Sequence, residues 1–213
     1  MYPQLIKLPK SKKDISILLK SFELSEDTKF IVEPKITGIH TEIFIEKEKY
    51  IINCKEDINE YVNTTYLNTI KFIQDVLIDT DITTSITLHM VYTNNTLILF
   101  NLSINDSLVS TATSFYLFHH WASICKSKDS MTSFKVVPCY PVTIDIKTFL
   151  EDILNNKKDS KTYINNTNYI EKLPSFYNLP EEYFTNGFII KPFDNVIKNN
   201  SGRYFIINIE NKM

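Results

Sequence analysis

The chain has few of the residues that build phosphate-binding loops and disulfide frameworks. Only three of its 213 residues are glycine, and none lie in a Gly-rich loop, an HExxH motif or a GxSxG motif, so the common nucleotide-loop, zinc-protease and hydrolase classes lack support. Its three cysteines, Cys54, Cys125 and Cys139, are far apart and in no CxxC spacing. We therefore expect neither a disulfide framework nor a zinc site, and a reducing compartment.

Long apolar runs and charge of one sign are also lacking. No apolar run approaches the ~18 residues of a membrane span, and the start, "MYPQLIKLPKSKKD", lacks the apolar core and cleavage site of a signal peptide. We expect a cytoplasmic or otherwise intracellular protein with no membrane partner. A net charge of −2 provides no global basic field, so any nucleic-acid contact must come from a local patch.

The composition that is present is that of a folded protein. Hydrophobic residues make up 43% and aromatic residues 13% of the chain, as in globular domains. Heavy use of Ile, Asn, Lys and Tyr indicates an AT-rich genome. No internal repeat occurs, and the one long polar stretch is "NNKKDSKTYINNTN" at 155–168. We expect a single domain over residues 1–213, with a mobile insert and no C-terminal accessory domain.

Alternating apolar and polar residues predict strands that pair in sequence order. The expected strands are "TKFIVEP" at 28–34, a hairpin over 41–56, a pair at 85–93 and 95–104 joined by Asn-Asn, a strand at 133–142 cut by prolines, and a last pair at 186–193 and 202–210 joined by "KNNSG". Most of these strands should pair antiparallel.

Three segments have helical periodicity. Residues 56–79 predict one amphipathic helix, residues 110–127 a largely buried helix with Ser110 or Thr111 as N-cap, and residues 145–156 a helix capped by Asp145. Strands outnumber helices and pair antiparallel, so the fold class is α+β.

One lysine stands in an unusual setting. In "VEPKITGIH", Lys35 ends a predicted strand and precedes Gly38 by three residues. The tetrapeptide alone is a weak signal, because lysines before glycines are common at strand ends. A hairpin follows it, however, and "NGFIIKP" and a final strand come much later in the chain. This order of elements resembles the covalent nucleotidyltransferase superfamily of ATP-dependent RNA ligases and capping enzymes, and within it the RNA-ligase-like members.

The first three motifs of that family have degenerate counterparts. "EPKITG" resembles the KxDG-like motif, with Thr37 in place of the acid. "KYIINCK" resembles the strand that ends in arginine, with Lys55 instead. "LILFNLSI" resembles the "FDI" strand, with Phe100 kept and Asn101 in place of the aspartate.

The later motifs are similarly altered. "NGFIIKP" matches the "EGFVIKP"-like strand in Gly187, Phe188, Lys191 and Pro192, with Asn186 in place of the glutamate. Before it, "VVPCYPVTIDIKTFLEDI" is similar to the Val-Pro strand and helix of many RNA ligases. The resemblance covers nearly the whole chain and depends on order and spacing.

The resemblance implies a fold, a reaction and a site. The fold would be a nucleotidyltransferase (ATP-grasp-like ligase) domain with two packed antiparallel sheets flanked by helices. In an active member, Lys35 would be the nucleophile that attacks the α-phosphate of ATP, with Mg²⁺ shielding the phosphate charge. The implied nucleotide-binding residues are Lys35, Gly38, Lys55, Phe100, Asn186 and Lys191.

Three charges that this reaction requires are missing. The glutamate of the "GE" strand has no counterpart near His89 and Met90, and Asn186 is neutral. On the last strand, Asn208 and Glu210 replace two lysines, and Glu210 would repel a phosphate. One such loss typically costs about 3 to 4 kcal/mol of barrier. We therefore expect a catalytically degenerate protein, with no cofactor assigned to it, that is a nucleotide- or RNA-end-binding or structural subunit.

Two other functions stay open. An active enzyme using ATP and Mg²⁺ would take the missing acids from elsewhere, for instance Glu33, Glu42 or Asp106. A protein-interaction module would use an exposed aromatic strand edge and have no nucleotide pocket. The candidate partners are accordingly RNA, a nucleotide, or a protein in a larger complex.

Several of the implied site residues have ordinary alternatives. Lys55 and Lys191 could be solvated lysines at strand ends, and Phe100 could be a core residue of an apolar strand. In "FHHW", His119 and His120 are adjacent on a helix and point about 100° apart, so they do not form a shared metal site. No metal ligand is expected.

Overall fold

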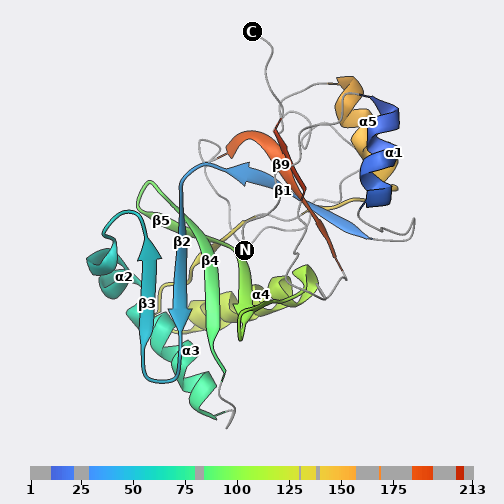
Figure 1. Ribbon diagram of the computed structural model, residues 1–213. Helices are drawn as coiled ribbons and strands as arrows, with labels where there is room; N and C mark the ends of the chain where they lie inside the picture. Colours follow the sequence, from blue (N-terminus) through green and yellow to red (C-terminus); the bar gives the residue numbers. More distant parts are fainter. Residues whose placement is uncertain are drawn as a thin grey trace. The chain divides into compact units, whose positions relative to one another are not determined.

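A computed structural model of the chain describes residues 11–21, 29–79, 84–129, 131–137, 140–156, 168, 184–193 and 205–208. The chain forms two compact units (Figure 1). Unit 1 comprises Met1–Ile36 and Pro138–Met213, and unit 2 comprises Thr37–Val137. The chain thus passes from unit 1 to unit 2 directly after the strand that carries Lys35. That the two units make one domain stays a prediction.

Unit 1 contains a four-stranded antiparallel sheet in the order β10-β9-β1-β8. Its strands are β1 Phe30–Ile36, β8 Tyr140–Pro141, β9 Phe184–Pro192 and β10 Phe205–Asn208. The first and last strands of the sequence prediction are therefore confirmed in position. The predicted "KNNSG" turn lies outside the described residues.

One face of this sheet packs on helices α1 (Lys12–Ser21) and α5 (Ile146–Asn156), which lie side by side in Figure 1. Alternate residues of β1 and β9 meet the helices in one apolar core: Ile15, Phe30, Val32, Ile146, Phe149, Leu150, Ile153, Phe188 and Ile190. The sequence analysis missed α1. The predicted insert at 155–168 begins inside α5, and all but its last residue then lies outside the described part.

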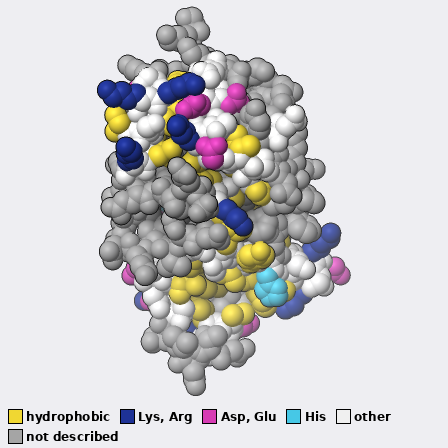
Figure 2. Space-filling view, turned by 90° about the vertical axis from the view of Figure 1, so that its right-hand side faces the viewer, with side chains coloured by type: hydrophobic (Ala, Val, Ile, Leu, Met, Phe, Trp, Pro, Cys, Tyr) yellow, Lys and Arg dark blue, Asp and Glu magenta, His cyan; other side chains and the backbone are white. Residues whose placement is uncertain are grey.

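The outer surface of α1 and α5 is mixed in charge and also exposes the apolar side chain of Ile17. In Figure 2, the upper part of the face carries basic and acidic side chains next to one another, where Figure 1 places these helices. Lys12 of α1 and Glu151 of α5 form an ion pair of 3.1 Å. This surface provides no field of one sign for a nucleic acid.

Unit 2 contains a six-stranded sheet in the order β3-β2-β4-β5-β6, with β7 parallel to β5. Its strands are β2 Ile39–Ile45, β3 Tyr50–Cys54, β4 Ile86–Thr93, β5 Thr96–Ile104, β6 Ser107–Leu108 and β7 Lys135–Val136. The predicted hairpin and strand pair are confirmed as β2-β3 and β4-β5. The α+β class is confirmed by this mixture of antiparallel sheets and helices.

Two Asn-rich turns link the strands around β5. Asn94 and Asn95 have φ values of 44° and 53°, and Asn105 and Asp106 have 48° and 62°. Two successive positive φ angles define the tight hairpin turn whose twist suits paired strands. The first turn was predicted from sequence. The second, which leads into β6, was not.

The prediction of one helix over 56–79 is wrong. The segment forms α2 (Asn59–Thr65) and α3 (Leu67–Asp79), with a break at Tyr66. The Thr64 hydroxyl donates to main-chain oxygens of the preceding turn, which weakens the helix locally. The Tyr66 ring stacks on Phe134 at 4.6 Å between centroids, so the residue at the break packs into the core.

Both predicted helix caps are confirmed. The Ser110 hydroxyl accepts from the Thr113 amide at 3.1 Å at the start of α4 (Thr111–Ser127). Asp145 Oδ1 accepts from the Thr148 amide at 2.8 Å at the start of α5. These bonds satisfy amide groups that the first helical turn leaves without partners. Helix α4 is less buried than predicted, since Tyr116 is 67% exposed.

The predicted strand at 133–142 is divided between the units. Strand β7 belongs to the sheet of unit 2 and β8 to the sheet of unit 1, so this segment returns the chain to the first unit. The intervening residues, including Cys139, lie outside the described part. Among the described helices, none is long and apolar enough to span a membrane.

Candidate functional site

Lys35 lies near the end of β1, where the pairing with β9 becomes irregular. Pro34 pairs with Phe188 and Ile36 with Phe184, so three residues of β9 face the single residue Lys35. Such a bulge turns the strand and redirects side chains. The middle residue of the three is Asn186, whose side chain lies outside the described part. The backbone therefore brings together two of the predicted site residues.

A buried ion pair joins β1 and β9 within this sheet. The Lys191 ammonium donates to Glu33 Oε1 at 2.8 Å and lies 2.8 Å from Oε2 as well, and each side chain is 2% exposed. The two residues are diagonal neighbours, because Lys191 pairs with Ile31 and Glu33 with Ile189. Lys191 is thus not a solvated lysine, and that alternative is wrong.

The pair is electrostatically demanding. Burial raises the pKa of the Glu33 carboxyl above its ordinary value, while the charge of Lys191 and its hydrogen bond oppose the rise. Moving two charges out of water costs several kcal/mol each unless they satisfy one another. A lysine balanced by a carboxylate in this way has little net positive charge left for a phosphate.

Gly38 is required by close packing of backbone. A Cβ atom at this position would come within 2.5 Å of the Tyr92 carbonyl oxygen and closer still to the Val91 side chain, both on β4. Its φ of 158° is also one that other residues rarely adopt. The conformation of unit 2 therefore explains this glycine without a ligand.

The other two predicted residues of unit 2 lie apart from Gly38 in the chain. Lys55 is exposed and follows β3. Phe100 is the extra residue of a bulge in β5, because His89 pairs with Asn101 and Met90 with Leu99. It is half-buried, so it is neither a fully buried core residue nor fully exposed.

The six predicted residues are thus divided between the two units. Lys35, Asn186 and Lys191 belong to β1 and β9 of unit 1, while Gly38, Lys55 and Phe100 belong to unit 2. Of the acids proposed as substitutes, Glu33 is committed to Lys191, and Asp106 is exposed in the β5-β6 turn. Glu42 belongs to another cluster. Glu210 lies outside the described residues, and Asn208 is described in backbone only.

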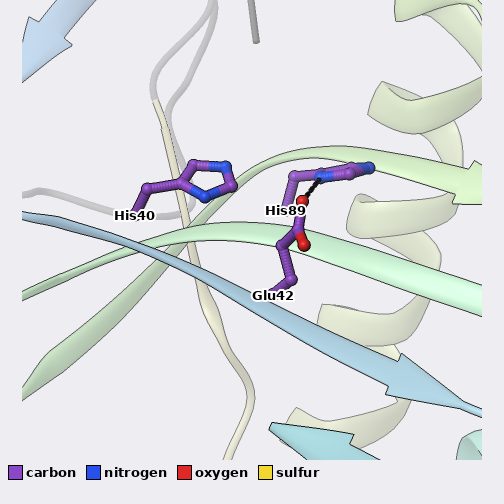
Figure 3. A group of neighbouring side chains, drawn as sticks. All are labelled: His40, Glu42 and His89. Atoms are coloured by element: carbon purple, nitrogen blue, oxygen red, sulfur yellow. Dashed lines mark ion pairs between the residues drawn. The ribbon is translucent and has the colours of Figure 1, made fainter. Parts of the chain in front are cut away.

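The cluster that contains Glu42 comprises His40, Glu42 and His89 (Figure 3). His40 and Glu42 are two apart on β2 and so lie on one face of the sheet, and Glu42 pairs directly with His89 of β4. Glu42 Oε1 lies 3.2 Å from His89 Nδ1. One nitrogen or oxygen of each of the three side chains lies within 4.8 Å of the others.

Burial favours the neutral form of both imidazoles. Burial lowers the pKa of His89 to about 4, against the attraction of Glu42, which raises it. Burial also lowers the pKa of His40, again with Glu42 opposing. Neutral imidazole offers a nitrogen lone pair, which is the form that binds metals.

Sequence reasoning missed this cluster. The three residues have no recognised metal spacing, and 47 positions separate Glu42 from His89 in the numbering of the chain. The one available signal was the alternation of β2, which places residues 40 and 42 on one face. The register of β2 against β4 was needed to add His89.

No protein-family model and no curated protein match the chain. Two solved structures, described only as Pmar-Lig_Pre and Pmar-Lig_PreS3, are similar to it at 14% sequence identity over 92% of this chain, with TM-scores of 0.48 and 0.46. The chain spans 50% of the length of each. Because TM-scores below 0.5 do not establish a shared fold, neither a family nor a function follows from this likeness.

Proposed function

We propose that the chain is an RNA-ligase-like nucleotidyltransferase domain that binds a nucleotide or a 5′-phosphorylated RNA end without transferring it. The observation that carries the proposal is the pairing of β1 with β9, which sets Lys35 opposite the segment that contains Asn186. In the family that the sequence resembles, the corresponding lysine and the "EGFVIKP"-like strand serve one nucleotide site. Lys35 and Asn186 are far apart in the sequence, so their proximity depends on the pairing of β1 with β9 and not on local connectivity.

The charges on this sheet favour binding over catalysis. A lysine at its ordinary pKa is protonated near pH 7 and must be desolvated or placed beside other cations before it can attack a phosphate. The nearest described cation on β9, Lys191, is balanced by Glu33. Asn186 replaces an acid that would hold Mg²⁺, and an amide binds this ion weakly.

The amine of Lys35 is suited to bind a phosphate. An ammonium group near a phosphate contributes a charge-assisted hydrogen bond, which is stronger than a neutral one. The bulge at Lys35 matters here because it breaks the regular ladder of backbone hydrogen bonds at that point. The proposed role of Lys35 is therefore to hold a phosphate group by charge.

Thermal unfolding of the full chain tests the proposal. A ligand that binds only the folded state must raise the melting temperature. ATP, GTP and a short 5′-phosphorylated RNA should be compared with the same RNA bearing a 5′-hydroxyl. We expect the 5′-phosphorylated RNA or a nucleotide to raise the melting temperature, and Lys35→Ala to abolish most of the shift.

The control is Lys49→Ala, which removes another lysine, 62% exposed at its side chain, in the β2-β3 turn. It should leave the shift unchanged. If none of these ligands raises the melting temperature, the chain has no such site and the protein-interaction function is favoured. If the shift survives Lys35→Ala, binding occurs elsewhere and the assignment to β1 and β9 is wrong.

A further inference from the structure

The His40, Glu42 and His89 side chains converge on one face of the unit 2 sheet from two adjacent strands. Figure 3 shows the Glu42 carboxylate against the His89 ring, with the His40 ring on the same side of the sheet. This arrangement does not use Lys35 or any other residue of the proposed nucleotide site. It therefore has to be explained separately.

The distances between the three side chains are compatible with a transition metal ion. Ligand atoms of a tetrahedral zinc site lie about 3.4 Å apart, given metal–ligand bonds of about 2.1 Å. Glu42 Oε1 and His89 Nδ1 are already 3.2 Å apart. One His40 ring nitrogen lies within 4.8 Å of a ligand atom of each of the other two residues, so binding of one ion requires this half-buried side chain to rotate toward them.

His89 and Glu42 each contact a further polar side chain, as the ligands of metal sites commonly do. His89 Nε2 lies 2.7 Å from the Ser103 hydroxyl, and Asn53 Nδ2 donates to Glu42 Oε2 at 3.4 Å. Metal-binding histidines usually donate their second N–H to an oxygen, which fixes the ring and its tautomer. The Ser103 hydroxyl oxygen can accept this hydrogen bond from Nε2–H, which leaves the lone pair of Nδ1 to bind the ion.

The alternative is an ordinary histidine–carboxylate pair in a sheet. That pair would account for Glu42 and His89 alone, and it needs neither the second imidazole nor a fixed position for Nε2. His40 lies 6.3 Å from His89 and 5.8 Å from Phe100, measured between ring centroids. The bulge at Phe100 thus places an aromatic ring beside the two histidines.

We infer that His40, Glu42 and His89 form a binding site for one Zn²⁺ ion. Two imidazole nitrogens and a carboxylate are ligands that zinc prefers, whereas Mg²⁺ and Ca²⁺ favour oxygen ligands. Three protein ligands leave a fourth position for water or a substrate atom, as in catalytic rather than structural zinc sites.

The experiment measures zinc affinity directly. The full chain, freed of metal with EDTA and then of EDTA, competes for Zn²⁺ with a chromophoric chelator near neutral pH. We expect one ion per chain. His40→Ala and Glu42→Gln should each weaken the affinity at least about 100-fold, because removing a ligand costs more than the 10- to 100-fold typical of a supporting residue.

Two further variants make the result specific. His120→Ala removes an exposed histidine of α4 and should leave the affinity unchanged. Ser103→Ala keeps all three ligands but removes the partner of His89, and it should weaken the affinity about 10- to 100-fold. His40 and Glu42 are not fully buried, so their variants should fold, which circular dichroism can verify.

Three results would overturn the site. They are no binding of Zn²⁺ by the metal-free chain, binding that is unchanged in both His40→Ala and Glu42→Gln, and binding that is lost only when the cysteines are alkylated. Each leaves the test of nucleotide binding untouched, because that test depends on Lys35.

Discussion

At the scale of single residues, the clearest departure from an ordinary fold is the ion pair between Glu33 and Lys191. Fully buried charges are rare because desolvation is costly, and such a pair often contributes little net stability. Removing only one partner of the pair has a much larger effect. The remaining charge would be buried without compensation.

We predict that Glu33→Gln and Lys191→Met each lower the free energy of unfolding by about 3 to 5 kcal/mol. The double variant should lose less than the sum of the two single losses, because neither charge is then left alone. Urea denaturation followed by fluorescence measures all three values. Lys12→Met breaks the ion pair with Glu151. Because the Lys12 side chain is 69% exposed, this variant should change stability by less than about 1 kcal/mol. Additive losses would contradict the pairing.

Gly38 permits a second test at this scale. Gly38→Ala should lower the free energy of unfolding by more than about 1 kcal/mol, because the added Cβ meets the backbone of β4. For a chain of this size, that corresponds to a fall in melting temperature of roughly 2 to 4 °C or more. The neighbouring exposed position serves as control, and Thr37→Ala should have little effect. Equal melting temperatures for both variants would show that the backbone can relax around the new methyl group.

At the scale of elements, the helix cap at Asp145 links stability to pH. Hydrogen bonds from the Thr148 side chain and amide lower the pKa of Asp145 below its ordinary value of 3.8. A carboxyl with a lowered folded-state pKa stabilises the fold above its unfolded-state pKa, and this contribution is lost as the pH falls through the folded-state value.

We therefore expect Asp145→Ala to lower stability by about 1 kcal/mol near neutral pH. The difference from the wild type should shrink below about pH 4, where the carboxyl becomes protonated. Asparagine caps helices nearly as well as aspartate, so Asp145→Asn should keep most of the stability and lose this pH dependence. Denaturation curves at several pH values provide the comparison. A constant difference between Asp145→Ala and the wild type down to pH 3 would contradict the role of the charge.

Elements with a strong local signal could be predicted from sequence. Alternation of apolar residues identified β2 and β3, and Asn94-Asn95 marked the turn between β4 and β5. Short elements could not. Strand β6 has two residues, too few for a period. Tyr66, at the break between α2 and α3, packs on Phe134, which is more than 60 positions away in the sequence.

At the scale of the whole molecule, contacts between residues far apart in the sequence are the features that were hardest to predict. The resemblance grouped Lys35 with "NGFIIKP", and the structure makes β1 and β9 neighbours. The resemblance gave no indication that Glu33 would form an ion pair with Lys191, which is 158 positions away. The His40, Glu42 and His89 cluster likewise required the register of one strand against another, which local pattern does not fix.

The division into two units could not be predicted from the sequence pattern. The boundaries fall after Ile36 and after Val137, and neither point has the Gly- or Ser-rich composition of a linker. The first boundary lies inside "KITG", one residue after Lys35. A motif that reads as continuous in the sequence therefore belongs to both units.

The central claim is that the chain binds a nucleotide or RNA end but forms no covalent adduct. Incubation with α-labelled ATP or GTP and Mg²⁺ or Mn²⁺, with one half of the sample filtered under native conditions and the other half denatured and resolved on a gel, tests it most directly. We expect label to be retained with the native protein, reduced in Lys35→Ala, and absent from the denatured protein. Label that survives denaturation and depends on Lys35 would instead show an active nucleotidyltransferase.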